Sequence, residues 1–250
     1  MGNRVTLAVS GVTVRSVRLA DVGPDGEAFL GPAERARAAG IRDAAARRDF
    51  VAGRIALRGF SAELLGVRPD ELTAEYSCPD CGKGPELDHG RPGYRLRGAS
   101  SAVGSGIGMS PGISGSPDPS RGAGLSLSLS RSRGWALLAA GARGPGETVG
   151  IDLEHRSGVG FPGFDDVVLT PAERRLLAAL SPDRADLWRT AVWARKEALL
   201  KARGTGLRLD PSSVEAFPPP TGGAVLVELD TVALGLPEGF AAALAVEENA

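Results

Sequence analysis

Three acidic residues, in two segments far apart in the chain, have the types and spacing of a magnesium site. Asp152 and Glu154 stand two residues apart in a stretch with the pattern of a strand, so their side chains point to the same side. Carboxylates this close repel each other unless a cation lies between them. Together with Glu197 they offer the hard oxygen ligands that Mg²⁺ prefers. The alternative for the first two residues is an exposed polar strand face.

Glu197 and Lys201 stand one helical turn apart in a stretch rich in Ala, Leu, Arg, Lys and Glu, the best helix formers. We expect a helix that begins near Pro182, behind Ser181 as N-cap, and ends at Gly204 as left-handed C-cap. An ordinary surface pair, worth about 0.3–0.5 kcal/mol, is the alternative to a catalytic one. The chain uses Arg almost everywhere, however, and two of its three lysines lie in this stretch. This bias favours a specific role.

The expected helix has two distinct faces on a 3.6-residue wheel. Trp193, Glu197 and Lys201 follow one another at spacing four. A separate apolar face, which we expect to be the buried one, consists of Trp188, Ala191, Val192, Leu199 and Ala202.

A second helical region is expected over residues 32–65. Arg47, Arg54 and Arg58 share one of its faces, and they are either solvated or a clamp for phosphate. The other face, which we expect to pack inward, consists of Phe50, Leu57, Phe60 and Leu64.

The remaining elements follow from alternation and turn signals. We expect a third helix from a capping box at Thr170 and Glu173 to about Leu180. Residues 125–130 alternate Leu and Ser, which predicts a half-buried strand. Further strands are expected over 4–20, 135–140, 147–154, 224–229 and 239–246.

The only two cysteines, Cys78 and Cys81, form a C-x-x-C pair. A structural zinc site needs four ligands, and the only histidines, His89 and His155, do not form a second paired motif. A redox role would need a strand-to-helix context that is missing here. We therefore interpret the pair as a turn that carries two reduced thiols.

Composition excludes several classes of protein. The net charge of −1 argues against bulk nucleic-acid binding. No run of 18 apolar residues predicts a membrane-spanning helix, and the N-terminus lacks the features of a signal peptide. We expect a cytoplasmic protein, and the preference for Arg over Lys is typical of a GC-rich bacterial genome.

The chain divides into two predicted halves, residues 1–150 and 151–250, each with strands and a long helix. Within the first half, residues 98–124 are rich in Gly and Ser and contain no aromatic residue. Such a stretch cannot bury enough apolar surface to offset its ordering entropy. We interpret it as a flexible insertion.

Two motifs, taken together and in this order, resemble the surfactin-type 4′-phosphopantetheinyl transferases. Gly150-Ile151-Asp152-Leu153-Glu154 follows the family pattern G-[IV]-D-x-E. The segment Trp193-Ala194-Arg195-Lys196-Glu197-Ala198, with Lys201, follows W-x-x-K-E-[AS]-x-x-K. The arginine helix and the strand pair at 125–140 extend the resemblance over most of the chain.

The resemblance implies an α+β fold, a pseudo-twofold pair of similar α/β subdomains with coenzyme A in the cleft between them. It implies Mg²⁺-dependent transfer of 4′-phosphopantetheine from coenzyme A to a serine of an apo acyl or peptidyl carrier protein, which releases 3′,5′-ADP. Two-half members usually act as monomers, and neither nucleic acid nor membrane is an expected partner.

The resemblance also implies roles for individual residues. Asp152, Glu154 and Glu197 would bind Mg²⁺, and Glu197 would also deprotonate the serine hydroxyl. Lys201 would stabilise the pyrophosphate and the leaving group. The residues expected to contact the cofactor are Arg47 (or Arg48), Arg54, Arg91 of Gly90-Arg91-Pro92, Ser130, Arg131 and Lys201.

One position departs from the family pattern. Family members have Ser-His-Ser where this chain has Ser130-Arg131-Ser132, and that histidine touches the pyrophosphate. Arginine keeps the charge and can bind phosphate bidentately, but it does not release a proton near neutral pH. Two alternatives stay open: a non-catalytic or weakened paralogue that binds coenzyme A or a carrier protein, and a magnesium-dependent phosphohydrolase that needs no carrier.

Overall fold

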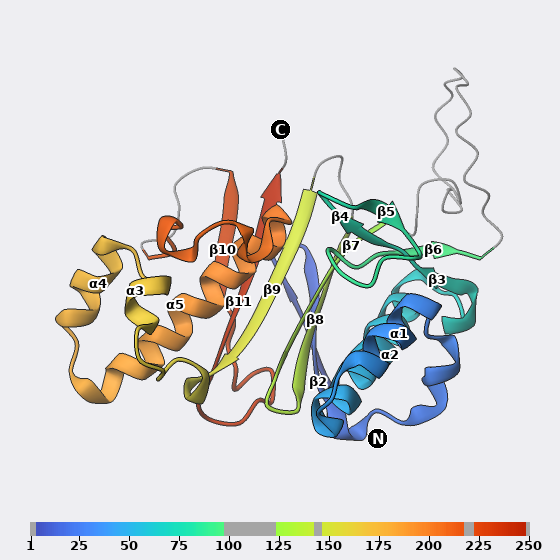
Figure 1. The fold of residues 1–250 in the computed structure, drawn as a ribbon, viewed down its shortest axis with the longest axis horizontal. Helices are drawn as coiled ribbons and strands as arrows, with labels where there is room; N and C mark the ends of the chain where they lie inside the picture. Colours follow the sequence, from blue (N-terminus) through green and yellow to red (C-terminus); the bar gives the residue numbers. More distant parts are fainter. Residues whose placement is uncertain (1–3, 98–123, 143–146, 218–222, 249–250) are drawn as a thin grey trace, which may run out of the picture.

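The protein is α+β, with two antiparallel sheets at its centre (Figure 1). The computed structural model describes residues 4–97, 124–142, 147–217 and 223–248. The first sheet has the order β1 (Arg4–Val9), β2 (Val12–Arg18), β8 (Trp135–Ala142) and β7 (Leu125–Ser132). The second has the order β10 (Ala224–Glu228), β11 (Phe240–Glu248) and β9 (Glu147–His155). The sequence predicted all of these strands, and at most strand ends the observed and predicted boundaries differ by no more than two residues.

Helix α2 (Ala44–Leu65) packs on the first sheet. It begins at Asp43, whose carboxylate accepts a hydrogen bond from the backbone N–H of Ala46, and it ends at Gly66 in the left-handed conformation. The expected helix over 32–65 is in fact two helices, because α1 (Pro32–Gly40) ends before this N-cap. The predicted inward face is confirmed except for Leu64, which is 40% exposed. The buried residues of the core between α2 and this sheet include Leu57, Phe60, Val17, Leu127 and Leu138.

Helix α5 (Pro182–Arg203) packs on the second sheet, so the strands lie between the two long helices (Figure 1). It ends at Gly204 with φ 71°, as predicted; Ser181 stands at the N-cap position, but its side chain makes no capping hydrogen bond. The expectation of a single buried face is wrong for the C-terminal half of α5. The segment around Val214 and Ala216 packs on this half together with the sheet, so further residues are buried there, among them Ala194, Ala198 and Leu200.

The two sheets meet along β7 and β9. The Ser126 hydroxyl accepts a hydrogen bond from the backbone N–H of Val149, and Ser128 accepts one from Ile151, each at 3.0 Å. The serine face of β7 is therefore buried. The prediction of a half-buried strand was wrong about this face, because a second sheet covers the side that sequence alternation alone assigns to solvent.

Shorter elements complete the fold. Two small antiparallel strand pairs lie beside α2 and β7 (Figure 1): β3 (Leu72–Ala74) pairs with β6 (Tyr94–Leu96), and β4 (Tyr76–Cys78) pairs with β5 (Gly82–Gly84). Helices α3 (Phe164–Val168) and α4 (Pro171–Ala178) precede α5. The predicted capping box at the start of α4 is confirmed.

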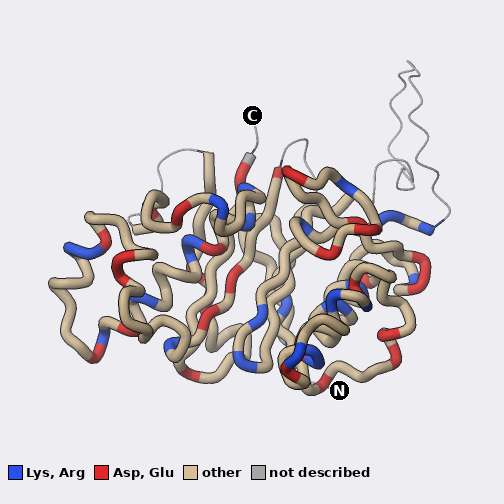
Figure 2. The backbone as a smooth tube through the Cα atoms, viewed as in Figure 1, with Lys and Arg blue, Asp and Glu red and all other residues tan. Residues whose placement is uncertain are grey.

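Basic and acidic residues are interspersed along the chain (Figure 2), in keeping with its net charge of −1. None of the helices in the described part of the chain has the length and apolarity that a membrane crossing requires. The predicted flexible insertion lies, apart from Gly124, outside the described residues. One 22-residue helix on each sheet is compatible with two similar subdomains; their pseudo-twofold relation and their boundary at residue 150 stay predictions.

Candidate active site

A cavity of about 640 Å³ lies where β7, β9, α5 and the loop after β4 come together. It brings together most of the residues that the sequence analysis selected. Those that line it are Arg54, Arg91, Ser130, Arg131, Asp152, Glu154, Glu197 and Lys201.

Strand β9, which carries Asp152 and Glu154, approaches helix α5 closely at Gly150. A Cβ added there would lie 2.0 Å from the carbonyl oxygen of Ala198 and 2.4 Å from the backbone nitrogen of Ala202. These two residues occupy the same part of α5 as Glu197 and Lys201. The absence of a side chain at position 150 therefore allows the close contact that brings the two motifs into one cavity.

Lys201 is at the centre of the charged groups. Its ammonium lies 2.5 Å from Asp152 Oδ1, 3.2 Å from the Ser130 hydroxyl and 3.9 Å from Glu197 Oε2. The Ser130 hydroxyl in turn donates to Asp152 Oδ1 at 2.7 Å. Burial alone would lower the pKa of Lys201, but the neighbouring carboxylates of Asp152 and Glu197 outweigh it, and the pKa is raised. Lys201 is therefore a firmly charged cation.

Glu154 and Glu197 are in an environment that disfavours their ionisation. Burial, followed by the negative charge of Asp152, raises the pKa of Glu154 to about 7. Burial also raises the pKa of Glu197, although Lys201 opposes it. Asp152 Oδ2 is buried and has no hydrogen-bond partner. Lys201 therefore does not fully compensate the negative charge that the three carboxyl groups can carry, as expected where a further cation is to bind.

The oxygens of the three carboxylates lie too far apart to form one compact group of metal ligands in this structure. In the described part of the chain, only Cys78, Cys81 and His89 form a group whose ligand atoms all lie within 4.8 Å of one another. Asp152, Glu154 and Glu197 share the cavity, but Lys201 contacts both Asp152 and Glu197.

Arginines from three elements form a cationic part of the cavity wall. The guanidinium of Arg131 lies 5.2 Å from the ring centre of Phe50, and that of Arg54 lies 5.0 Å from the same ring. Desolvation by burial, followed by the charge of Arg54, lowers the pKa of Arg131 to about 10, so the guanidinium of Arg131 is still charged at neutral pH. Arg91 donates to the carbonyl of Ala202 in α5 at 2.5 Å.

The other arginines of the first helical region have different positions. Arg47 and Arg48 are exposed, and neither lines the cavity. Both explanations offered for Arg58 are wrong, since it is buried, donates to the carbonyl of Leu72 and lies 3.6 Å from Glu34. A 3.6-residue pattern places residues on a face but does not say which part of that face is covered.

A buried ion pair holds α5 in place. Lys196 lies 2.6 Å from Glu173 of α4, and both side chains are fully buried. The same ammonium donates to the carbonyl of Pro211, and Glu173 also accepts from the backbone N–H groups of Thr170 and Ala216. The two lysines of the motif thus have different environments: Lys196 links α5 to α4, and Lys201 lines the cavity.

Sequence reasoning did not select several further residues that line the cavity. Among them are Cys78, at the end of β4, and His89, in the loop between β4 and Arg91; Thr205 and Arg208 follow α5. Arg208 forms an ion pair with Asp80 of that loop. The Gly-Thr-Gly sequence that follows α5 was the one available signal for this second loop.

Comparison with known proteins agrees with the motif pair. Residues 148–244 match the family model of the 4′-phosphopantetheinyl transferase superfamily. The matched segment contains α5 and all of β9 except Glu147, and therefore all three acidic residues and Lys201. No curated protein matches the chain.

Two solved structures are similar to part of the chain. One is a holo-(acyl-carrier-protein) synthase from Bacillus anthracis str. Ames in complex with CoA (3′,5′-ADP), at 22% identity over 41% of this chain and 96% of that one, with a TM-score of 0.33. The other is the holo-[acyl-carrier-protein] synthase (AcpS) of Thermotoga maritima, at 26% identity over 41% of this chain and 63% of that one, with a TM-score of 0.30.

Proposed function

We propose that this protein is a surfactin-type 4′-phosphopantetheinyl transferase that uses Mg²⁺ and transfers the phosphopantetheine arm of coenzyme A to a serine of an acyl or peptidyl carrier protein. The observation that carries the proposal is the single cavity that Asp152, Glu154 and Glu197 share with Lys201 and four arginines. Carboxylates for a divalent cation beside cations for a diphosphate are the parts that phosphoryl transfer requires. The match of residues 148–244 to the superfamily supports the same class of reaction.

The donor set fits Mg²⁺. All three carboxylates supply hard oxygens, and Asp152 Oδ2 is buried without a partner. Asp152, Glu154 and Glu197 would hold the ion. Bound Mg²⁺ would neutralise the charge of the diphosphate and polarise the phosphorus that is attacked.

The chain's own residues would handle the proton and the remaining charge. The carrier serine oxygen forms a bond to the β-phosphorus of coenzyme A, the bond from that phosphorus to the bridging oxygen breaks, and 3′,5′-ADP leaves. Glu197 would accept the hydroxyl proton, because its raised pKa makes it a better base than an ordinary glutamate. Lys201 would bind phosphate oxygens and stabilise the charge on the leaving group.

The arginines would hold the cofactor. Arg54 and Arg131 are positioned by the Phe50 ring that both contact, and Arg91 is held to α5 through Ala202. Charge-assisted, bidentate contacts of this kind are strong for phosphate. Of the two arginines expected to contact phosphate from this helix, Arg47 lies outside the cavity wall, so we keep that role for Arg54 alone. We propose that the protein acts as a monomer in the cytoplasm.

Arg131 favours one second candidate, a paralogue that binds coenzyme A or a carrier protein without transfer. An arginine here cannot exchange protons near neutral pH. The complete set of Asp152, Glu154, Glu197 and Lys201 in one cavity argues for the transferase instead.

The direct test incubates the purified full chain with coenzyme A, Mg²⁺ and a panel of apo carrier proteins from fatty-acid, polyketide and nonribosomal-peptide systems. We expect at least one carrier to gain the mass of the phosphopantetheine arm while 3′,5′-ADP appears. The same carrier with its acceptor serine replaced by alanine must gain nothing. Binding of coenzyme A without any mass gain across the panel would support the paralogue, and phosphate release without a carrier would support the phosphohydrolase.

A further inference from the structure

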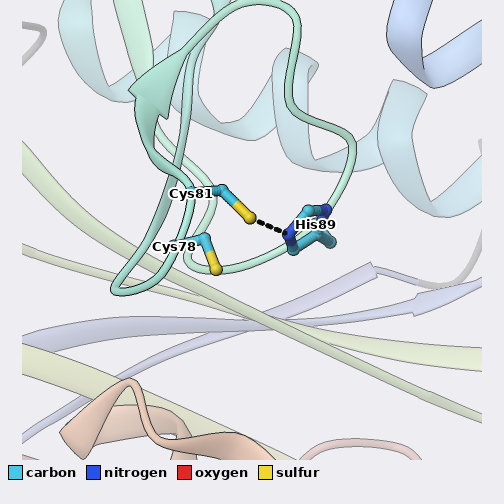
Figure 3. A group of neighbouring side chains, drawn as sticks. All are labelled: Cys78, Cys81 and His89. Carbon is cyan, nitrogen blue, oxygen red and sulfur yellow. Dashed lines mark hydrogen bonds between the residues drawn. The ribbon is translucent and has the colours of Figure 1, made fainter.

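The loop that follows β4 brings two thiols and an imidazole together at the edge of the cavity. Cys78, Cys81 and His89 point toward one another (Figure 3), and their ligand atoms all lie within 4.8 Å of one another. Cys81 Sγ and His89 Nε2 are 3.4 Å apart. A tetrahedral zinc ion with bonds of about 2.0–2.3 Å separates its ligand atoms by roughly 3.5–3.8 Å, so only small side-chain movements separate this cluster from a coordination shell.

The backbone explains why residues 78 and 89 meet. Ser77 and Arg91 exchange two backbone hydrogen bonds of 3.0 and 2.8 Å, which close the intervening loop. Gly90 has φ 89°, and a Cβ there would lie 2.3 Å from the carbonyl oxygen of Ser77. The bridge therefore places Cys78 and His89 at the base of one loop, with Cys81 on the turn between them. The sequence interpretation, a turn that carries two reduced thiols, did not include this closure.

The surroundings match those of metal ligands. Asp88 Oδ1 lies 2.9 Å from His89 Nδ1, which orients the ring with Nε2 toward the thiols. A carboxylate on the distal nitrogen is the usual partner of a metal-bound histidine. Both cysteines are free thiols.

We propose that Cys78, Cys81 and His89 bind one zinc ion, with water in the fourth position. Two thiolates and one imidazole are a soft to borderline donor set, which suits zinc and differs in kind from the carboxylates assigned to Mg²⁺. Cys81 and His89 are exposed, which leaves room for the water. The ion holds the loop closed next to Arg91, and so stabilises one wall of the cavity. This inference does not depend on the proposed transfer reaction.

The test measures metal directly on the full chain. Protein purified after expression with added Zn²⁺, and dialysed against metal-free buffer, should contain about one zinc per chain by mass spectrometry of the metal. Co²⁺ in place of zinc should give thiolate-to-metal charge-transfer absorption and the visible bands of a tetrahedral site. Zinc should also slow alkylation of both thiols.

Variants locate the site. Cys81→Ser and His89→Ala should each lose the bound zinc, and Asp88→Asn should weaken binding roughly 10–100-fold. His155→Ala, which removes the other histidine, is the matched control and should keep one zinc. If a variant does not fold, the Co²⁺ spectrum of the unmodified chain still decides the question. Wild-type protein without stoichiometric zinc or without the charge-transfer band, or with a Cys78–Cys81 disulfide after purification, would overturn the proposal.

Discussion

Gly150 of β9 lies directly against Ala198 of α5, so closely that a Cβ on the glycine would lie 2.0 Å from the alanine's carbonyl oxygen. The strand carries Asp152 and Glu154, and the helix carries Glu197 and Lys201 one residue before and three after the contact. The distance between the two motifs is thus set by a backbone contact that only glycine permits.

Gly150→Ala should separate the strand from the helix. The added methyl group meets helix backbone, which cannot rotate away as a side chain can, so we expect a loss of about 1–3 kcal/mol in the free energy of unfolding and a strong decrease in carrier loading. Urea denaturation and the loading assay measure the two effects. Gly59→Ala in α2 is the control, since nothing lies within 4 Å of its new Cβ, and a helical Gly→Ala change stabilises by about 1 kcal/mol. Equal stabilities for the two variants would contradict the argument.

Glu197→Gln should abolish most transfer and keep the fold. It removes both the proposed base and one oxygen ligand, and loss of a positioned base costs about 10²–10⁴-fold in rate. Carrier loading followed by intact mass gives the rate, and circular dichroism checks the fold. Glu238→Gln changes an exposed glutamate outside the cavity and should load carriers at the wild-type rate. A Glu197→Gln enzyme of normal rate would remove this residue from the mechanism.

Glu173→Gln should destabilise the protein through Lys196. It leaves a fully buried ammonium without its carboxylate partner, and breaking a buried pair in this way costs about 3–5 kcal/mol. Arg174→Gln breaks the exposed pair with Asp166, which is worth about 1 kcal/mol or less. Chemical denaturation of both variants should therefore give clearly different midpoints, and similar midpoints would show that the buried pair is not needed to hold α4 on α5.

Glu154 should make stability depend on pH. Its pKa is raised from 4.5 to about 7 on folding, so between these values the folded protein keeps a proton that the unfolded chain has released. The free energy of unfolding must then fall as pH rises from about 4.5 to about 7. A pKa difference of one is worth about 1.4 kcal/mol, and we expect a total loss of roughly 1–3 kcal/mol. Glu154→Gln should remove this slope.

Mg²⁺ should act in the opposite direction at neutral pH. It binds the ionised carboxylates of the folded protein only, and a ligand of the folded state raises the free energy of unfolding. Denaturation at pH 7 with and without Mg²⁺ measures the gain. No gain in the wild type, or an equal gain in an Asp152→Asn variant, would contradict the assigned ligands.

Arg131→Ala should weaken binding of coenzyme A. Loss of a charged hydrogen bond costs about 1.5–3 kcal/mol, or roughly 10–100-fold in Kd, as measured by calorimetry. Arg133→Ala, two residues on and outside the cavity wall, should bind normally. Arg131→His tests the paralogue: if only this variant loads carriers, the natural arginine marks a protein that binds without transfer.

Local structure followed from the sequence because it depends on near neighbours. The C-cap at Gly204, the capping box at Thr170 and the alternation along β7 each involve residues within a few positions of one another. The side-by-side placement of Asp152 and Glu154 follows from strand geometry, and the spacing of Glu197 and Lys201 from helix geometry. Two wrong expectations, the exposed serine face and the single buried face of α5, both concern which side of an element another element covers.

What the tertiary structure decided was the partner of each side chain. It made Lys196 a buried ion-pair partner and Lys201 a cavity cation, although both stand on one helix five residues apart. It separated Arg54, which lines the cavity, from exposed Arg47 and buried Arg58, and it brought His89 to the two cysteines. Periodicity determines the direction of a side chain relative to its own helix or strand. Its surroundings depend on long-range packing, and no local pattern contains that information.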